Sequence, residues 1–299
     1  MKRLIVITGP TASGKSDLSL ELAKRLNTSI ISADSRQMYR DISIGTAAPT
    51  LEERAVVPYY FIGNLSLEDY YSAYKFETES LEIINDIFKT SDYCIVCGGS
   101  MLYIDALTRG LDDIPTISPG IREKFAIMYT EKGLNYLLEI LKEKDPEYYR
   151  IVDKNNHKRV IHALEIIYES NQKYSALRTS KQKKRPFQVY EFALQYSREQ
   201  LFNRINDRVD KMLEHGLIDE ARKVYPMRGY NSLNTVGYKE LFAAFDGLMT
   251  IEDAVEKIKK NTRIYAKKQL TWLKKRNTIL LDSSLPANKL CENILNVIS

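Results

Sequence analysis

The chain has 299 residues, of which 44% are hydrophobic and 28% are charged, and its formal net charge is +5. This composition is typical of a soluble globular protein, and no apolar run approaches the roughly 18 residues of a membrane span. Three cysteines are too few and too unevenly spaced for a disulfide framework, and the N-terminus shows no signal-peptide pattern, so we expect a reducing, cytoplasmic location.

Charge is unevenly distributed along the chain. Residues 1–112 contain 11 Lys and Arg against 15 Asp and Glu, whereas residues 113–299 contain 33 against 24. A basic excess of this kind suits a polyanionic partner such as a nucleic acid. It also fits a basic, well-solvated helical surface, so charge alone leaves both interpretations open.

The first part of the chain alternates predicted strands with predicted helices. Residues 3–8 form a short apolar run typical of a buried strand, and a Gly-rich loop after it leads into a helical pattern with Leu18, Leu22 and Leu26 on one face. The other elements predicted here are a strand over 29–33, a helix over 67–90 and a strand over 93–97. Apolar strands that alternate with helices favour an α/β fold with a parallel sheet.

The middle of the chain has helical patterns without strand signals between them. Helices are predicted over 119–131, 134–144 and 155–170, and the basic stretch RTSKQKKRP follows them. Residues 187–196 then alternate like a strand that rejoins the sheet. We therefore predict a mostly helical insertion domain, residues 114–186, within an α/β domain formed by residues 1–113 and 187–299.

Two long helices are predicted after the insertion. Ser197 has the pattern of a helix N-cap, with Gln200 three residues later, and Gly216 is a stop signal for that helix. Residues 250–276 predict the second helix, which carries nine Lys and Arg between Lys257 and Arg276.

The stretch GPTASGKS is the most specific local signal. It follows a predicted strand and opens a predicted helix, and in that setting the loop directs backbone N–H groups at a phosphate. Lys15 adds a cation, and the hydroxyl of Ser16 can hold a Mg2+ ion that bridges phosphate oxygens. The predicted phosphate site comprises Gly9, Pro10, Thr11, Ala12, Ser13, Gly14, Lys15 and Ser16, with Ser16 as the metal ligand.

Asp34 is a candidate general base. We predict that it ends the strand beside the phosphate-loop strand, so that its carboxylate faces the crevice at the carboxyl edge of the sheet. A carboxylate in that place can accept a proton from an attacking nucleophile. A helix N-cap or a role in a metal shell is the alternative.

Arginines follow the strand predicted over 187–196. Arg204 and Arg208 are four residues apart and share a helical face, while Arg198 lies near the helix start. Guanidinium groups suit a diphosphate, especially one that gains charge as it leaves. Surface ion pairs with Asp207 or Glu199 are the alternative.

Several stretches of this chain resemble the motifs of one enzyme family. GPTASGKS, SADSRQMYRDISIGTAAP, GGSMLY, NTVGYKEL and KKQLTWLK occur in the order and spacing found in tRNA dimethylallyltransferases, also called tRNA isopentenyltransferases. The resemblance extends over about residues 1–283, and IGTAAP and QLTW are not features of P-loop NTPases in general. It implies a P-loop NTPase-like parallel sheet flanked by helices.

The resemblance also implies an activity. The family transfers a dimethylallyl group from its diphosphate to N6 of the adenosine on the 3′ side of the anticodon, and it releases diphosphate. The phosphate loop would then hold the leaving group, and Mg2+ would be the cofactor. The implied chemical residues are Lys15, Ser16, Arg198 and Arg204 around the diphosphate, Asp34 as the base, and Ser100 where the family usually has Thr.

By resemblance, the adenosine flips out of the anticodon loop and enters a channel opposite the donor. The implied tRNA contacts are Asp34, Ser35, Arg36, Gln37, Ser100, Arg122, Lys158, Arg159, Lys239, Lys267, Lys268, Gln269 and Lys274. His162, Asn234 and Lys268 stand where family members often have Arg, and Lys does not reproduce the fork of an Arg side chain.

Other activities fit parts of the pattern. A nucleoside or small-molecule kinase also has a P-loop and an acidic residue after its second strand, but this leaves IGTAAP, GGSMLY and QLTW unexplained. An adenylate isopentenyltransferase performs the same chemistry on a free nucleotide, whereas the basic second half and the long insertion favour a macromolecular acceptor. A GTPase-like RNA-binding switch lacks its Asn-Lys-x-Asp signature here. We expect a monomer.

Overall fold

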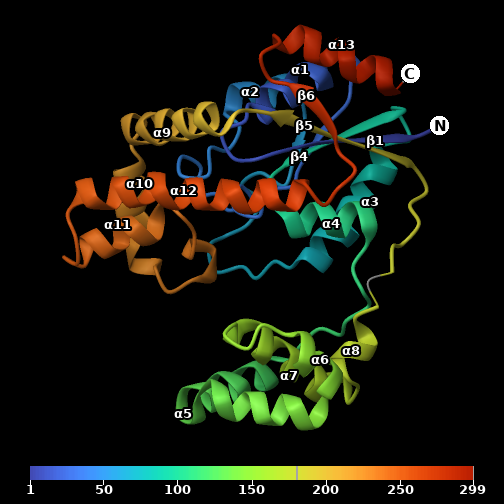
Figure 1. Ribbon diagram of the computed structural model, residues 1–299. Helices are drawn as coiled ribbons and strands as arrows, with labels where there is room; N and C mark the ends of the chain where they lie inside the picture. The colour runs from blue at the N-terminus through green and yellow to red at the C-terminus, as the bar shows by residue number, and fades with distance from the viewer. Residues whose placement is uncertain (180, 299) are drawn as a thin grey trace. The chain divides into compact units, whose positions relative to one another are not determined.

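A single parallel sheet organises the larger part of the protein. The computed structural model describes residues 1–179 and 181–298. Its six strands lie in the order β3-β2-β4-β1-β5-β6, and every neighbouring pair is parallel (Figure 1). The strands are β1 (Arg3–Thr8), β2 (Ile30–Ser32), β3 (Tyr59–Tyr60), β4 (Tyr93–Gly98), β5 (Gln188–Gln195) and β6 (Ile279–Asp282).

The strand order corrects one prediction from the sequence. β4 lies between β1 and β2, pairing Ile5 with Ile95 on one side and Ile30 with Ile95 on the other. Asp34 therefore does not end the strand beside the phosphate-loop strand. It ends the strand one further along, and because all these strands are parallel, the carboxyl ends of β1, β4 and β2 still meet at one edge of the sheet.

Helices cover the sheet and extend beyond it. Those of the sheet-containing unit are α1 (Lys15–Leu26), α2 (Leu51–Val56), α3 (Ala73–Ile87), α4 (Met101–Arg109), α9 (Arg198–Glu214), α10 (Leu217–Val224), α11 (Tyr238–Phe245), α12 (Ile251–Leu273) and α13 (Ala287–Ile298), with short 3-10 turns at Tyr225–Met227 and Asn231–Leu233. α1 and α13 pack together on one face of the sheet, where Leu22 and Ile294 are completely buried (Figure 1).

A second core holds the helices that follow β5. Val209 of α9, Leu217 of α10, Tyr238 of α11 and Ile258 of α12 are all buried in it. The predicted start of α9 is confirmed, because the Ser197 hydroxyl accepts from Gln200 N at 3.2 Å and the Gln200 side chain accepts from Ser197 N at 3.1 Å. None of the helices in residues 1–179 and 181–298 has the length and apolar character needed to cross a membrane.

The chain divides into two compact units. One consists of Met1–Thr108 and Arg185–Ser299, and the other of Arg109–Lys184, so the inserted unit begins and ends slightly earlier than the predicted 114–186. The inserted unit is helical, with α5 (Pro119–Lys144), α6 (Pro146–Ile151), α7 (His157–Ser170) and α8 (Tyr174–Leu177). The two helices predicted before Asp145 join as α5, with a break at Gly133, where φ is 75°. Its core includes Phe125, Leu141 and Leu164.

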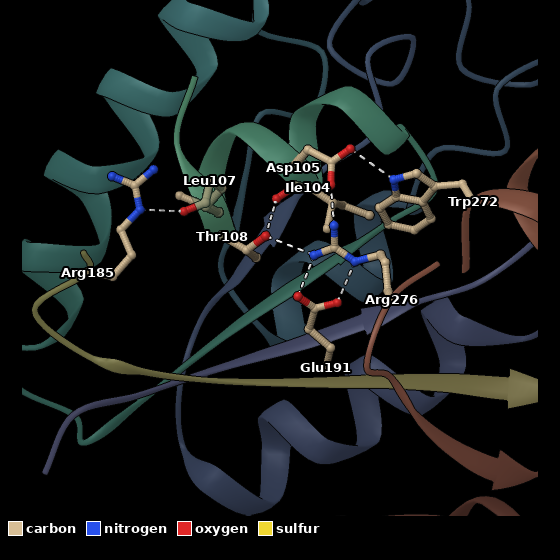
Figure 2. A network of polar contacts seen from close by, with 8 residues as sticks. All are labelled: Ile104, Asp105, Leu107, Thr108, Arg185, Glu191, Trp272 and Arg276. Atoms are coloured by element: carbon tan, nitrogen blue, oxygen red, sulfur yellow. Dashed lines mark hydrogen bonds and ion pairs between the residues drawn. The ribbon is translucent and has the colours of Figure 1, made fainter. Parts of the chain in front are cut away.

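A buried polar network ties α4 to β5 and α12 (Figure 2). Arg276, directly beyond α12, donates to Glu191 Oε2 at 2.6 Å and to Thr108 Oγ1 at 2.9 Å, and it also bonds the Asp105 carboxylate. The indole N–H of Trp272 donates to the other Asp105 oxygen at 2.9 Å. The Arg276 side chain is only 1% exposed, so its charge is compensated by Asp105 and Glu191 rather than by water.

Replacing Arg276 with Gln is expected to lower the free energy of unfolding by about 3 kcal/mol, because two half-buried carboxylates would lose their cation. Urea unfolding at neutral pH measures this change. Lys289→Gln is the matched control, since Lys289 pairs with Glu292 at 2.8 Å on the exposed surface and should change stability little. If Arg276→Gln changed the free energy of unfolding as little as Lys289→Gln does, the network would add no stability.

Candidate active site

The phosphate loop connects β1 to α1 in a compact conformation. Gly14 has φ of +81°, a conformation that favours glycine, and a Cβ there would lie 3.4 Å from an Arg204 guanidinium nitrogen. Arg204 Nε donates to the Ala12 carbonyl at 2.8 Å, and Tyr196 OH donates to the Ser13 carbonyl at 3.0 Å. These two bonds occupy loop carbonyls, while the first N–H groups of α1 have no acceptor within the helix.

A cavity of about 420 Å³ lies over this loop. Cations and the helix N-terminus make it suited to an anion. Ser13 Oγ is buried without a hydrogen-bond partner within the described residues, and Gly9 and Pro10 are not among the lining residues. The cavity is lined by Ala12, Ser13, Gly14, Lys15, Ser16, Asp17, Ala47, Ala48, Pro49, Glu53, Arg204, Asp207, Arg208 and Lys211.

Lys15 is a half-buried cation in this cavity. Its ammonium donates to the Pro10 carbonyl at 3.3 Å. Burial lowers the pKa of Lys15 below its ordinary 10.5, and the nearby positive charge of Arg208 lowers it further, against the opposing influence of Cys97 and Asp34. A bound phosphate anion would stabilise the protonated form, so Lys15 is suited to hold one.

The three arginines near the start of α9 lie in different surroundings. Arg204 and Arg208 line the loop cavity, whereas Arg198 is exposed and its guanidinium lies 5.2 Å from the centre of the Phe202 ring. The diphosphate contact at Arg198 stays a prediction, since its side chain is not among those lining the loop cavity. Arg208 does line that cavity, and burial lowers its pKa while the charge of Asp34 raises it.

A larger cavity of about 620 Å³ contains Asp34 and Ser100. Asp34 Oδ1 accepts from Arg36 N at 2.9 Å, and Ser100 Oγ accepts from Ser35 N at 2.9 Å. The other lining residues are Thr11, Ser35, Arg36, Gly45, Thr46, Ile205, Arg208, Val209, Met212, Leu217, Asn234, Thr235, Val236, Gly237, Lys239, Ile258, Asn261, Thr262, Ile264, Tyr265 and Lys268.

Arg208 lines both cavities, so a cation stands where they meet. The loop cavity offers N–H groups and positive charge, and the larger cavity offers a carboxylate and a hydroxyl. This arrangement can hold an anionic leaving group on one side and a nucleophile that loses a proton on the other.

The segment 45–49 runs between the two cavities, since Gly45 and Thr46 line the larger one and residues 47–49 line the loop cavity. A carboxylate holds the start of this segment. Glu220 accepts from Ile44 N and from Gly45 N, both at 2.8 Å, and Tyr238 OH donates to the same carboxylate at 2.5 Å. A Cβ on Gly45 would lie 2.4 Å from the Tyr238 hydroxyl oxygen, so the approach requires glycine. The IGTAAP and NTVGYKEL stretches contain Gly45 and Tyr238, but Glu220 has no sequence signal of its own and was missed.

Two residues predicted to contact tRNA form hydrogen bonds inside the protein. Gln37 accepts from Ser32 Oγ at 2.9 Å and donates to the Ala47 carbonyl at 3.0 Å. Gln269 is 2% exposed, and its amide bonds Thr11 N and the Gly99 carbonyl. Both amides are hydrogen-bonded within the chain, and the tRNA contacts at Gln37 and Gln269 stay predictions. Thr11 likewise offers no free N–H to a diphosphate.

The remaining predicted tRNA residues are placed as follows. Lys239 and Lys268 are exposed and line the larger cavity, and Lys274 is exposed just beyond α12. Lys267 is exposed and lies 5.7 Å from the centre of the Phe202 ring. In the inserted unit, Lys158 and Arg159 are exposed in the first turn of α7, while Arg122 is half-buried on α5.

We expect the loop cavity to lose affinity for inorganic diphosphate as pH rises. This loss should begin at a lower pH than it would with a lysine of ordinary pKa. Lys15 must be protonated to hold the anion, and its lowered pKa means that the proton is lost as pH rises toward 10.5 rather than above it. Calorimetry between about pH 7 and pH 10 measures the change. The Lys15→Arg variant remains charged throughout and should show no such alkaline loss, and an identical alkaline loss in both proteins would contradict the assignment.

Known proteins match this chain over most of its length. A family model described as IPP transferase matches residues 37–276. tRNA dimethylallyltransferase 2 of Azobacteroides pseudotrichonymphae is 51% identical over 279 residues, which cover 93% of this chain and 91% of that protein. tRNA dimethylallyltransferase 1 of Phocaeicola vulgatus is 52% identical over 277 residues, 93% of this chain and 92% of that protein.

Solved structures agree with the sequence matches. The tRNA isopentenylpyrophosphate transferase of Bacillus halodurans is 35% identical, with a TM-score of 0.73, and the match covers 100% of this chain and 96% of that one. A eukaryotic dimethylallyltransferase acting on tRNA is 29% identical, with a TM-score of 0.80, and the match covers 95% of this chain and 74% of that one. On the family model and these identities, the chain belongs to the IPP transferase family.

Proposed function

We propose that this protein is a tRNA dimethylallyltransferase, which transfers a dimethylallyl group from dimethylallyl diphosphate to N6 of the adenosine next to the anticodon. The observation that carries the proposal is the pair of cavities that meet at Arg208. One is suited to a diphosphate and the other holds Asp34 and Ser100. The names of the relatives, which are tRNA dimethylallyltransferases, support the same activity.

The residues have distinct parts in the proposed reaction. The bond from the dimethylallyl carbon to the diphosphate oxygen breaks, and a bond from that carbon to N6 forms. Lys15, Arg204 and Arg208 stabilise the charge that develops on the departing diphosphate. Asp34 accepts the proton released from N6. The Ser100 hydroxyl lines the same cavity, where it accepts from Ser35 N and donates to Ser35 Oγ at 3.2 Å, and we place it beside the adenine edge.

The donor set of the loop cavity fits Mg2+. The residues that the structure describes contain no group of three or more His, Cys, Asp or Glu side chains able to hold a metal. Mg2+ is commonly bound by few protein oxygens together with substrate phosphates and water, and the exposed Ser16 hydroxyl at the start of α1 offers one such oxygen. When bound with the donor, the ion would neutralise part of the diphosphate charge.

The proposed acceptor is tRNA rather than a free nucleotide. The larger cavity has Lys239 and Lys268 in its lining, and Lys158 and Arg159 add exposed cations on the inserted unit. Positive side chains beyond the space for one nucleoside suit the phosphates of a longer strand. A kinase would use the same loop for ATP, but the family match and the named relatives favour prenyl transfer.

We further propose a cytoplasmic monomer. The three cysteines, Cys94, Cys97 and Cys291, are buried and unpaired, which suits a reducing compartment. Burial raises the pKa of Cys97, which disfavours the reactive thiolate and suits a packing role.

The test mixes the purified protein with Mg2+, unmodified tRNA and dimethylallyl diphosphate labelled in the prenyl group. Parallel reactions contain AMP, or a nucleoside with ATP. Label in tRNA at an adenosine beside the anticodon is the expected result. Label in AMP alone would assign the protein to free-nucleotide prenylation, and phosphorylation of the nucleoside without prenyl transfer would make it a kinase.

A further inference from the structure

Gln269 links the two parts of the candidate active site through its side-chain amide. Its Oε1 accepts from the Thr11 backbone N–H at 2.9 Å, and its Nε2 donates to the Gly99 carbonyl at 2.9 Å. Thr11 belongs to the phosphate loop, and Gly99 directly precedes Ser100. One side chain on α12 therefore connects the loop that would hold the donor to the turn that carries a hydroxyl of the acceptor cavity.

The Gln269 amide packs closely against Gly99. A Cβ on Gly99 would lie 2.4 Å from Gln269 Nε2, so the amide can approach this carbonyl only because the residue is glycine. Gln269 itself is 2% exposed. A buried amide that uses both its oxygen and its nitrogen fixes the separation of its two partners, because moving either one would leave a buried polar group unpaired.

The helix that carries Gln269 is itself anchored. Trp272 follows Gln269 by three residues on α12, and Arg276 lies just beyond the end of the helix at Leu273. They bond Asp105 and Thr108 of α4, and Arg276 also bonds Glu191 of β5 (Figure 2). Since α4 begins immediately after Ser100, these bonds hold α12 and the residues just beyond it along α4, and Gln269 bonds the turn that precedes α4.

We propose that Gln269 is a positioning residue that fixes the phosphate loop relative to the Gly99–Ser100 turn, so that the donor and the acceptor meet in the reactive geometry. Only the part of this inference that concerns Ser100 and the acceptor rests on the proposed function. The part that concerns the phosphate loop requires only that the loop binds an anion. Loss of the amide would misalign the loop N–H groups, which weakens diphosphate binding, and would shift Ser100, which lowers turnover.

The principal test compares Gln269→Leu with the wild type. The substitution keeps the approximate volume and removes both hydrogen bonds. We expect kcat for tRNA prenylation to fall by about 100-fold, the cost of a misplacement near 1 Å, with the melting temperature and the tRNA affinity recorded alongside. We also expect the Kd for inorganic diphosphate, measured by calorimetry, to rise by about tenfold. Gln188→Leu, the same change at an exposed position on β5, is the matched control.

The Gln269→Glu variant tests whether the hydrogen bonds of Gln269 are required, or only the volume of its side chain. A protonated carboxyl group can donate to the Gly99 carbonyl and still accept from Thr11, whereas the ionised form repels that carbonyl. Activity relative to the wild type is therefore expected to recover as pH falls from about 9 to about 6, since burial raises the pKa of a carboxyl group. Gly99→Ala, which displaces the amide while retaining Gln269, should reduce diphosphate affinity in the same direction and serves if Gln269→Leu fails to fold.

The outcomes distinguish this inference from the proposed function. If the folded Gln269→Leu protein binds diphosphate as the wild type does and turns over within about twofold of it, the positioning role is refuted, whatever the acceptor is. A loss in activity that Gln269→Glu does not recover at low pH would also refute it. If the wild type prenylates no tRNA, the proposed function fails, and the diphosphate measurements still decide the role of Gln269.

Discussion

Replacing Asp34 with Asn should lower kcat for tRNA prenylation by about 10³-fold, the range expected for loss of a general base. Asn keeps the size of the side chain and can still accept from Arg36 N, so the turn held by that 2.9 Å bond should persist. What disappears is the carboxylate that accepts the N6 proton. The affinity for tRNA should therefore change little, because the fold of the cavity is unaltered.

Single-turnover kinetics with labelled donor measure this change without interference from product release, and a filter-binding assay gives the tRNA affinity. Asp86→Asn is the matched control, since Asp86 pairs with Lys89 on the exposed surface at 2.7 Å. A folded Asp34→Asn enzyme that turns over at a rate near that of the wild type would remove Asp34 from the chemistry. A large loss of tRNA affinity with normal turnover of bound tRNA would make it a binding residue.

Arg204 and Arg208 should each matter far more than Arg198. Arg204→Gln and Arg208→Gln are each expected to reduce kcat/KM for the donor by about 10²-fold or more, because both guanidinium groups line the cavity in which the leaving group gains charge. Arg198→Gln should have an effect within about twofold, as expected of an exposed side chain that contacts the Phe202 ring.

Steady-state kinetics with varied dimethylallyl diphosphate, together with the Kd for inorganic diphosphate, measure all three variants. Arg198→Gln is itself the control, because it makes the same chemical change on the same helix. A large donor defect in Arg198→Gln, with normal behaviour of Arg208→Gln, would restore the assignment made from the sequence and overturn the one made from the cavity.

Local patterns predicted most of the elements that form the site. The apolar runs of β1 and β4, the loop between β1 and α1, and the capping pair at Ser197 and Gln200 were all identified, since each depends on neighbouring residues. The order of the strands depends on pairing between distant segments, and nothing local shows that β4 lies between β1 and β2. The short β6 and the helix α13 that follows it were missed.

The surroundings of two predicted site residues depend on the fold. Arg198 precedes Arg204 by six residues, which on an α-helix is a rotation of about 240°, so the two side chains leave α9 in different directions. The tRNA contact at Gln269 rests on the family resemblance, and the structure shows that Gln269 is buried on α12. Glu220 acts through a loop that is remote in sequence, and only the folded structure shows that contact.

Two segments of the chain join the inserted unit to the sheet-containing unit. Their arrangement determines how freely the inserted unit can change in length and sequence. Arg185 donates to the Leu107 carbonyl at 2.8 Å (Figure 2). It also donates to the Ala106 carbonyl at 2.7 Å and pairs with the buried Glu77. Lys183 N donates to the Arg109 carbonyl at 2.7 Å. The outgoing and returning segments are thus neighbours, so a helical module can be lengthened, exchanged or rebuilt there without reordering the sheet. In evolutionary terms, the helical unit and the sheet-containing unit can diverge at different rates.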